Sequence, residues 1–293
     1  MTTRGTGPAD SLEPSPGRGS KVLGNRAVLV SSASTVLFFA AIALLLALAP
    51  GSGLVAERFL SPFHLWQSIR GTPAEPSVLG AFLLNVYIFA ISEVFILVLA
   101  LVIAVVRGIP GPVFFPFRMV AVAYTDVFRG VPLILILYII GFGVPGLGIA
   151  YFSYLSEVTY GIIALVLVYS AYVAEVYRAG IESIHESQNA AARSLGLTRF
   201  QSLRFVVLPQ AIRRVIPPLL NDFIGLQKDT ALVSVLGSIE AARAAQIYSA
   251  SQFNYTSYVV AALLFVLITI PLARFTDRLI ARDKRRRQAG GLA

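Results

Sequence analysis

The sequence contains no cysteine, which excludes disulfide bonds, thiolate catalysis and cysteine-ligated zinc. Its only two histidines, His64 and His185, lie far apart in the chain and are predicted on opposite sides of a membrane, so no histidine metal site is expected. No nucleophile stands beside a base, which disfavours a membrane-embedded enzyme. No Gly-x-x-x-x-Gly-Lys-Ser/Thr motif occurs either, so the chain lacks the phosphate-binding loop that could hydrolyse ATP.

Charged side chains are also scarce. They make up 13% of the 293 residues, whereas 56% of the residues are hydrophobic and the mean hydropathy is +0.76. A single soluble core cannot hide this much apolar surface. A helix that crosses a bilayer needs about 20 mostly apolar residues, because every backbone polar group must be satisfied within the segment. The composition therefore predicts an all-α integral membrane protein.

Six stretches are predicted to be transmembrane helices. Four of them carry no charge apart from Glu93, and they are Ala27–Ala49, Val78–Val106, Val158–Ala174 and Thr256–Ala273. Two further stretches are interrupted by charged residues, glycine or proline, and they are Met119–Phe142 and Val215–Ile239. These spans delimit a disordered tail (1–26), a first transmembrane helix (27–49), an external loop (50–77), a core domain (78–280) and a basic tail (281–293).

The distribution of basic residues predicts the orientation. With six spans and both termini in the cytoplasm, 19 of the 24 lysines and arginines lie inside, and only Arg58, Arg70 and Arg243 lie outside. Topology and contact with lipid headgroups explain the formal charge of +9, so no nucleic-acid partner is expected. The sequence around Ala49 also fits a signal-peptide cleavage site, but the long apolar run and Pro50 favour an uncleaved anchor.

A polar hairpin is predicted between the fourth and fifth spans, in the cytoplasmic stretch QNAAARSLGLTRFQSLRFVVLP (188–209). Residues 190–195 are strong helix formers, and Gly196 occupies the position of a left-handed C-terminal cap. Thr198 then begins a second helix, and Gln201 completes a capping box with it.

The second helix of the hairpin has one apolar side. Phe200, Leu203 and Val207 recur at helical spacing, and Leu208-Pro209 is expected to end the helix because proline cannot continue the hydrogen-bond ladder. An apolar side of this kind suits either a loop that rests on lipid headgroups or an element that docks into a groove of a soluble partner.

The hairpin resembles the EAA loop of ABC-importer permeases, the segment that docks on the ATP-hydrolysing subunit in that family. The resemblance extends over roughly residues 79–283 and includes VFRGVPLILILYI (127–139), AYVAEVYRAGIESI (171–184) and LPQAIRRVIPPLLNDFIGLQKDTALVSVLG (208–237), which are similar to the polar amino-acid uptake branch of the histidine/glutamine type. It implies that the hairpin couples the permease to its ATPase through Ala190, Ala191, Ala192, Gly196, Leu208 and Pro209.

Two features depart from that family. Ala190 stands where the glutamate of the EAA loop is usual, and the first predicted helix is added to a core of five spans. The resemblance implies a multi-pass subunit of the bacterial cytoplasmic membrane. Its partners would be a second permease (a copy or a paralogue), a pair of ATPase subunits that bind ATP and magnesium, and an external solute-binding protein delivering a polar amino acid; the chain itself would need no cofactor. The alternative is a secondary transporter driven by an ion gradient, although no internal repeat of spans supports it.

Ionisable residues inside predicted spans are candidates for a transport path, because they are costly unless they face a bundle interior or water. Asp222 and Asp229 share one helix face, and Asn221, Gly225 and Lys228 form the neighbouring stripe. This helix either lines the path or holds an internal ion pair between Lys228 and an aspartate. The similarity of LQKDTAL (226–232) to a family motif adds Thr230 and favours the path or its gate.

A second candidate element is FRGVP (128–132), where Arg129, Gly130 and Pro132 should break or bend the helix. Broken helices in membranes mark cavities where free backbone groups meet a solute, although a simple kink is the alternative. Glu175 lies near the inner face and can pair with Arg178 one turn later. The predicted path or gating set is Arg129, Pro132, Glu175, Asn221, Asp222, Lys228, Asp229 and Thr230.

Overall fold

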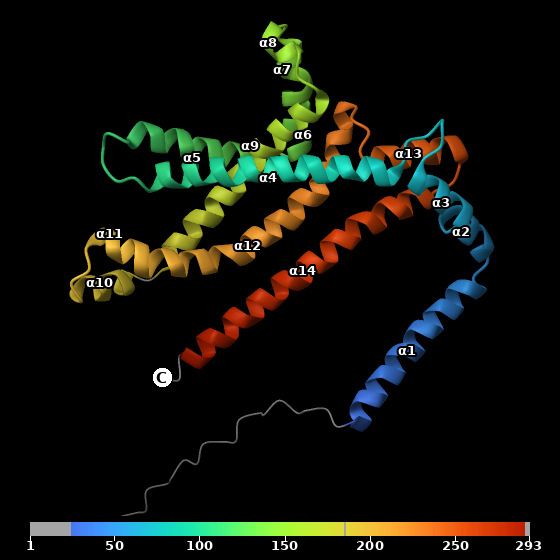
Figure 1. The fold of residues 1–293 in the computed structure, drawn as a ribbon, viewed down its shortest axis with the longest axis horizontal. Helices are drawn as coiled ribbons and strands as arrows, with labels where there is room; N and C mark the ends of the chain where they lie inside the picture. Colours follow the sequence, from blue (N-terminus) through green and yellow to red (C-terminus); the bar gives the residue numbers. More distant parts are fainter. Residues whose placement is uncertain (1–24, 185, 291–293) are drawn as a thin grey trace, which may run out of the picture. The chain divides into compact units, whose positions relative to one another are not determined.

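The computed structural model describes residues 25–184 and 186–290, and these residues form helices and turns without a strand. The predicted tail (1–26) falls almost entirely outside these residues, and His185 does so too. Figure 1 shows the helices along the chain. They are α1 (Asn25–Leu48), α2 (Ser52–Phe59), α3 (Pro62–Arg70), α4 (Val78–Gly108), α5 (Phe115–Gly130), α6 (Leu133–Tyr138), α7 (Val144–Gly146), α8 (Ala150–Ser153), α9 (Glu157–Glu182), α10 (Glu186–Ser194), α11 (Arg199–Ser202), α12 (Leu208–Asp229), α13 (Ala241–Gln252) and α14 (Thr256–Gly290).

Three short helical segments depart from the α-helical hydrogen-bond pattern. Two are π-helical turns, Ile139–Gly143 and Leu203–Val207, and one is a 3₁₀ segment, Thr230–Leu236. The chain divides into two compact units, Met1–Val55 and Ala56–Ala293. In the first unit, α1 covers nearly all of the predicted span Ala27–Ala49, and its apolar stretch Val30–Leu45 is exposed on all sides.

The predicted spans are matched to different degrees. Among the described residues, α4, α9 and the part of α14 up to Arg282 are long and apolar enough to cross a membrane. The pair α5 and α6–α7 adds a fourth span if it is counted as one, and it corresponds to Met119–Phe142. Within the described residues, the first stretch contributes only the shorter apolar helix Val30–Leu45, and no helix in Val215–Ile239 meets both the length and the hydropathy criteria. The count of six spans therefore stays a prediction.

The core of the second unit lies between α4 and α9. Ile88, Ile96 and Ala100 of α4 pack with Ala164 and Leu165 of α9, and α5, α6 and α12 close this core from the sides. A smaller core joins α3, α4, α13 and α14. Serine caps fix where the two central helices begin: Ser77 Oγ accepts from Gly80 N at 2.9 Å, and Ser156 Oγ accepts from Thr159 N at 3.3 Å.

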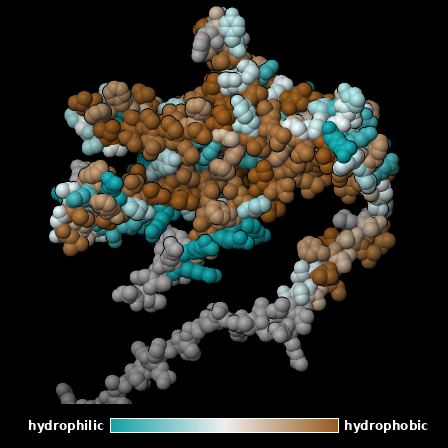
Figure 2. Space-filling view, in the orientation of Figure 1, coloured by the Kyte–Doolittle hydropathy of each residue, from teal (hydrophilic) through white to brown (hydrophobic). Residues whose placement is uncertain are grey.

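The outer surface of this unit is strongly apolar. Figure 2 shows hydrophobic residues over most of the visible face of the helices, with hydrophilic residues gathered towards the ends. Leu83, Phe95 and Val98 of α4 and Leu263 and Leu267 of α14 are exposed. Soluble monomers rarely expose contiguous apolar patches beyond a few hundred Å² (about 300–600 Å²), so a surface of this kind belongs in a bilayer.

The arginines that are predicted to lie outside and the hairpin are at opposite ends of this unit. Arg58, Arg70 and Arg243, which are predicted to lie outside, belong to α2, α3 and α13. These elements gather at one end, and the hairpin of α10 and α11 lies at the other (Figure 1). Contacts such as that of Arg58 Nη1 with Phe253 O at 2.6 Å hold the first end together. The structure thus places these arginines and the hairpin at different ends, and which end faces the cytoplasm stays a prediction.

Candidate functional site

A sharp break interrupts the fold at the predicted FRGVP motif. Helix α5 ends at Gly130, α6 begins at Leu133, and the two parts of the pair form an angle of 107°. Val131 is extended (φ −96°, ψ 131°), as expected for a residue before proline, because the Pro132 ring disfavours the helical conformation there. The predicted break near Arg129 is therefore confirmed, and it is a bend far larger than an ordinary helix kink.

Two neighbouring cavities lie beside this break. One of about 460 Å³ is lined by the break, by α9 and by α12, and one of about 660 Å³ continues between α9 and the first half of α12. Both are lined by Arg129, Tyr172 and Asp222, so together they form one route along the helices that carries charged side chains. We call the first the middle cavity and the second the inner cavity, since the latter reaches Ser183 and Arg214 next to the hairpin.

The middle cavity brings together most of the predicted path residues. Arg129, Pro132, Asn221, Asp222 and Asp229 line it. Tyr169 Oη donates to Asp229 Oδ2 at 2.7 Å, and Gly225 leaves room for this ring, since a Cβ atom there would lie 3.1 Å from the Tyr169 hydroxyl. Asp222 differs from Asp229, because its Oδ2 is buried without a hydrogen-bond partner among the described residues.

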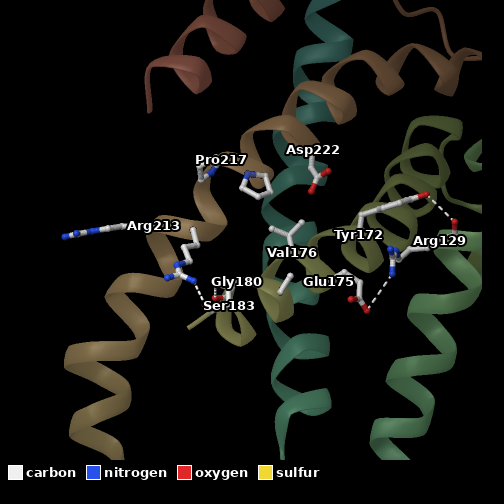
Figure 3. Close-up of a pocket in the computed structure, with 12 residues that line it drawn as sticks. Arg129, Tyr172, Glu175, Val176, Gly180, Ser183, Arg213, Pro217 and Asp222 are labelled. Atoms are coloured by element: carbon white, nitrogen blue, oxygen red, sulfur yellow. Dashed lines mark hydrogen bonds and ion pairs between the residues drawn. The ribbon is translucent and has the colours of Figure 1, made fainter. Parts of the chain in front are cut away.

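Glu175, which lines the inner cavity, is the centre of an ion-pair cluster, and Figure 3 shows its pair with Arg129. Its carboxylate pairs with Arg178 at 2.7 Å, with Arg129 at 3.7 Å, and with Arg107 of α4. Arg107 also donates to Thr125 Oγ1 of α5 at 3.0 Å, so the cluster ties α4, α5 and α9 together. The predicted pair of Glu175 with Arg178 is confirmed, and the structure adds two partners from other helices.

Two predicted path residues do not line either cavity. Lys228 is exposed, and no ion pair within the described part of the chain joins it to an aspartate. Thr230 is fully buried, where it accepts from Asn85 Nδ2 at 3.1 Å and donates to Gln227 O at 2.8 Å. The same Asn85 amide donates to the buried Glu240 at 3.0 Å, so Thr230 belongs to a network that joins α4 to the start of α13.

The lining includes residues that sequence reasoning missed. They are Tyr169 and Tyr172 of α9 and Arg213, Arg214 and Pro217 of α12. Tyr172 Oη donates to Arg129 O at 3.3 Å, and the Arg129 guanidinium lies 5.8 Å from the centre of the Tyr172 ring. The two tyrosines stand three residues apart, so they share one face of α9. This spacing is the feature of the sequence from which their common lining role could have been predicted.

Within the described residues, no group of three or more histidine, aspartate or glutamate side chains could hold a metal ion.

The turn of the hairpin has the predicted geometry. Gly196 has φ +85°, Gly196 N donates to Arg193 O at 3.0 Å, and Leu197 N donates to Ala192 O at 3.3 Å, which is a Schellman motif. Thr198 N donates to Gln201 Oε1 at 2.9 Å and Gln201 N donates to Thr198 Oγ1 at 3.3 Å, so the capping box is present.

The predicted end of the hairpin at Leu208-Pro209 is wrong. The helix passes from α11 through the π-helical turn Leu203–Val207 directly into α12. Proline lacks an N–H and its ring crowds the carbonyl four residues earlier. The π-turn shifts the bonding partner, with Leu208 N donating to Leu203 O, and a wider turn of this kind accommodates the proline at the start of α12. The hairpin is therefore joined to a path-lining helix without an intervening loop.

The apolar side of the hairpin is uncovered. Phe200 and Leu203 of the predicted apolar side are exposed, whereas Val207 is half-buried. Phe205, Leu208 and Leu195 before the turn are exposed as well. Of the predicted coupling residues, Ala192 is buried, whereas Ala191 and Gly196 lie on the surface.

Comparison with known proteins identifies the family. Residues 97–286 match the family described as the binding-protein-dependent transport system inner membrane component. The chain belongs to this family. It is thus a permease component of a binding-protein-dependent transport system, and membership gives no support to a secondary transporter. Helices α5 to α13 lie entirely within the match and carry both cavities and the hairpin, whereas α1, α2 and α3 precede it.

Individual relatives of this permease are named as amino-acid transporters. The probable glutamine ABC transporter permease protein GlnM of Bacillus subtilis is 37% identical over 60% of this chain and 79% of its own length. The arginine transport system permease protein ArtQ of the same organism is 32% identical over 72% and 93%. A solved amino acid ABC transporter with histidines is 31% identical, with a TM-score of 0.64 over 70% of this chain and 93% of its own. The inward-facing methionine transporter MetNI has a TM-score of 0.57 at 19% identity over 76% of this chain and 98% of its own, and it shares the fold.

Proposed function

We propose that this permease imports a polar amino acid as the membrane subunit of an ABC transporter in the bacterial cytoplasmic membrane. The observation that carries the proposal is the route formed by the two cavities, which runs from the broken helix at Pro132 to the end where the hairpin lies. Arg129 and Asp222 line it with charges of both signs, as a zwitterionic solute requires. The relatives named for glutamine and arginine support an amino acid as the solute.

The hairpin is the element that receives the ATP-induced closure of the ATPase subunits. Its exposed apolar side suits a groove on an ATPase subunit, and its helix continues into α12, which lines the route. Closure of two ATPase subunits that hold ATP and magnesium would move α12 against α9 and change which end of the route is open. A second permease completes the membrane part, and a solute-binding protein docks at the end formed by α2, α3 and α13.

The proposal is tested by the ATPase activity of the complete complex in nanodiscs. The permease is purified with the ATPase encoded beside it, and the neighbouring solute-binding protein is added after loading with each proteinogenic amino acid in turn. We expect at least one loaded form to stimulate hydrolysis above the level of the unloaded protein. An ATPase that forms a stable complex but responds to no loaded form would contradict amino-acid import.

Replacing Gly196 by valine should uncouple hydrolysis from uptake. The left-handed conformation costs a residue with a Cβ atom about 1–2 kcal/mol, and a β-branched side chain fits it worst. A Cβ atom at Gly196 meets nothing within 4 Å, so the strain acts on the turn alone and not on packing. We expect uptake in proteoliposomes to fall by roughly tenfold, the ratio that corresponds to this cost.

The matched control for this prediction is Gly196→Asn, because asparagine tolerates the left-handed conformation. It should retain most of the uptake, while the valine variant assembles or couples poorly. Equal and normal uptake by both variants would refute the docking role of the turn.

A further inference from the structure

The middle cavity has an excess of negative charge. One guanidinium, that of Arg129, and two carboxylates, those of Asp222 and Asp229, line it. Arg129 also lies 3.7 Å from Glu175, a carboxylate that Arg107 and Arg178 already neutralise. The lining therefore carries one more negative than positive charge, before its surroundings are considered.

A third carboxylate, that of Glu93, lies near the middle cavity but does not line it. The ring centres of Phe89 on α4 and Phe223 on α12 are 4.4 Å apart, which brings these helices together beside Asp222. Glu93 lies one helical turn after Phe89 and so shares the face of α4 that meets α12 beside Asp222. In the described part of the chain no ion pair involves Glu93 or Asp222.

The Asp222 carboxylate is left open to a ligand. Its Oδ2 is buried and accepts no hydrogen bond from any described residue, although a buried carboxylate oxygen normally has a donor. Asp229, by contrast, already accepts from Tyr169. A charged group inside a membrane is costly unless it meets an opposite charge. A cationic donor is the partner that would compensate the Asp222 carboxylate most fully.

We infer that the middle cavity selects amino acids with a cationic side chain, such as arginine or lysine, over neutral and acidic ones. This inference rests on the proposed import function. The Arg129 guanidinium takes the α-carboxylate of the solute, Asp229 takes its α-ammonium group, and Asp222 takes its cationic side chain. Glu93 acts as a positioning residue: it does not line the cavity, and its charge strengthens the preference for a cation at Asp222.

The test is equilibrium binding to the permease–ATPase complex in nanodiscs without the solute-binding protein, which would otherwise preselect the ligand. The probes are radiolabelled arginine, lysine, glutamine and glutamate. We expect arginine and lysine to bind roughly tenfold or more tightly than glutamine, the effect of one charge-assisted hydrogen bond, and glutamate to bind most weakly.

Substitutions distinguish the effect of charge on arginine binding from the effect of the shape of the site. Asp222→Asn should weaken arginine binding by roughly tenfold and leave glutamine binding within about threefold, whereas Asp222→Glu should keep the preference for arginine. Glu93→Gln should weaken arginine binding by about threefold, because it acts through the field and not by contact. Asp126→Asn is the matched control, since Asp126 is exposed and lines neither cavity, and it should bind all probes as the wild type does.

The wild-type ratio of arginine to glutamine binding decides the inference even if Asp222→Asn fails to fold. Equal binding of the two probes, or an Asp222→Asn variant that keeps the preference for arginine, would overturn it. Stimulation of the ATPase by a binding protein loaded with a neutral amino acid would then leave the import function standing. A complex that no loaded binding protein stimulates would instead remove the import function itself.

Discussion

Replacing Glu175 by glutamine should destabilise the permease by about 3 kcal/mol, because it leaves the guanidinium of Arg107 buried without a counter-charge. The Arg107 side chain is only 14% exposed and that of Glu175 16%, so water compensates little. Arg129 and Arg178 lose the same partner, and three arginines are then left close together. The measurement is the fraction of monodisperse protein that survives heating, followed by size-exclusion chromatography in detergent.

Two further variants test whether the loss of stability comes from the unpaired guanidinium of Arg107. Glu182 also pairs with Arg178, at 2.5 Å, but it is 61% exposed, so Glu182→Gln should cost less than about 1 kcal/mol. The double variant Arg107→Gln with Glu175→Gln should recover part of the loss, since the unpaired buried charge is then gone. If Glu175→Gln and Glu182→Gln lower the thermal stability equally, the cluster does not hold α4, α5 and α9 together.

Local features of the site could be predicted because they depend on neighbours in the sequence. The break at Gly130 and Pro132 follows from the proline ring, and the turn at Gly196 follows from the conformational freedom of glycine. The capping box of Thr198 and Gln201 spans only three residues. In each case the stereochemistry of a few residues suffices, and no tertiary contact overrides it.

Long-range pairings could not be predicted. Nothing in the sequence pattern relates Arg107 to Glu175, 68 residues later, or Tyr169 to Asp229, 60 residues later. These pairs exist because α4, α9 and α12 pack side by side. Lys228 illustrates the same limit: its position in the sequence suggested an ion pair with an aspartate, yet the helix turns it outwards. Periodicity places residues on one face, but the packing of helices decides what each face meets.

Pro209 shows a different limit. The rule that proline ends a helix considers only the α-helical hydrogen-bond pattern, whereas one π-helical turn provides another way to accommodate the ring. This difference matters for mechanism, because a loop at Pro209 would isolate the hairpin from α12. A continuous helix would instead transmit displacement from the hairpin to Asp222, as the proposed mechanism requires.

The packing of α9 against α12 should not tolerate a single added methyl group at Gly180. A Cβ atom at Gly180 would overlap Cγ2 of Val215, because the two would lie closer than carbon atoms can approach. Val215 is buried and, being β-branched in a helix, has few alternative rotamers. Gly180→Ala should therefore push α9 away from α12 and cost about 2–3 kcal/mol by overpacking, measured as the loss of monodisperse protein on heating.

The double variant Gly180→Ala with Val215→Ala distinguishes this steric account from an effect of backbone flexibility. Val215→Ala alone leaves a cavity and should cost about 1–2 kcal/mol, but the methyl group added at position 180 would fill part of that space. The double variant should thus be more stable than Gly180→Ala, with a coupling of about 1–2 kcal/mol. Gly180 and its neighbours line the inner cavity, so uptake should recover together with stability. Additive losses in the double variant would mean that Gly180 is required for its flexibility and not for the close approach of the two helices.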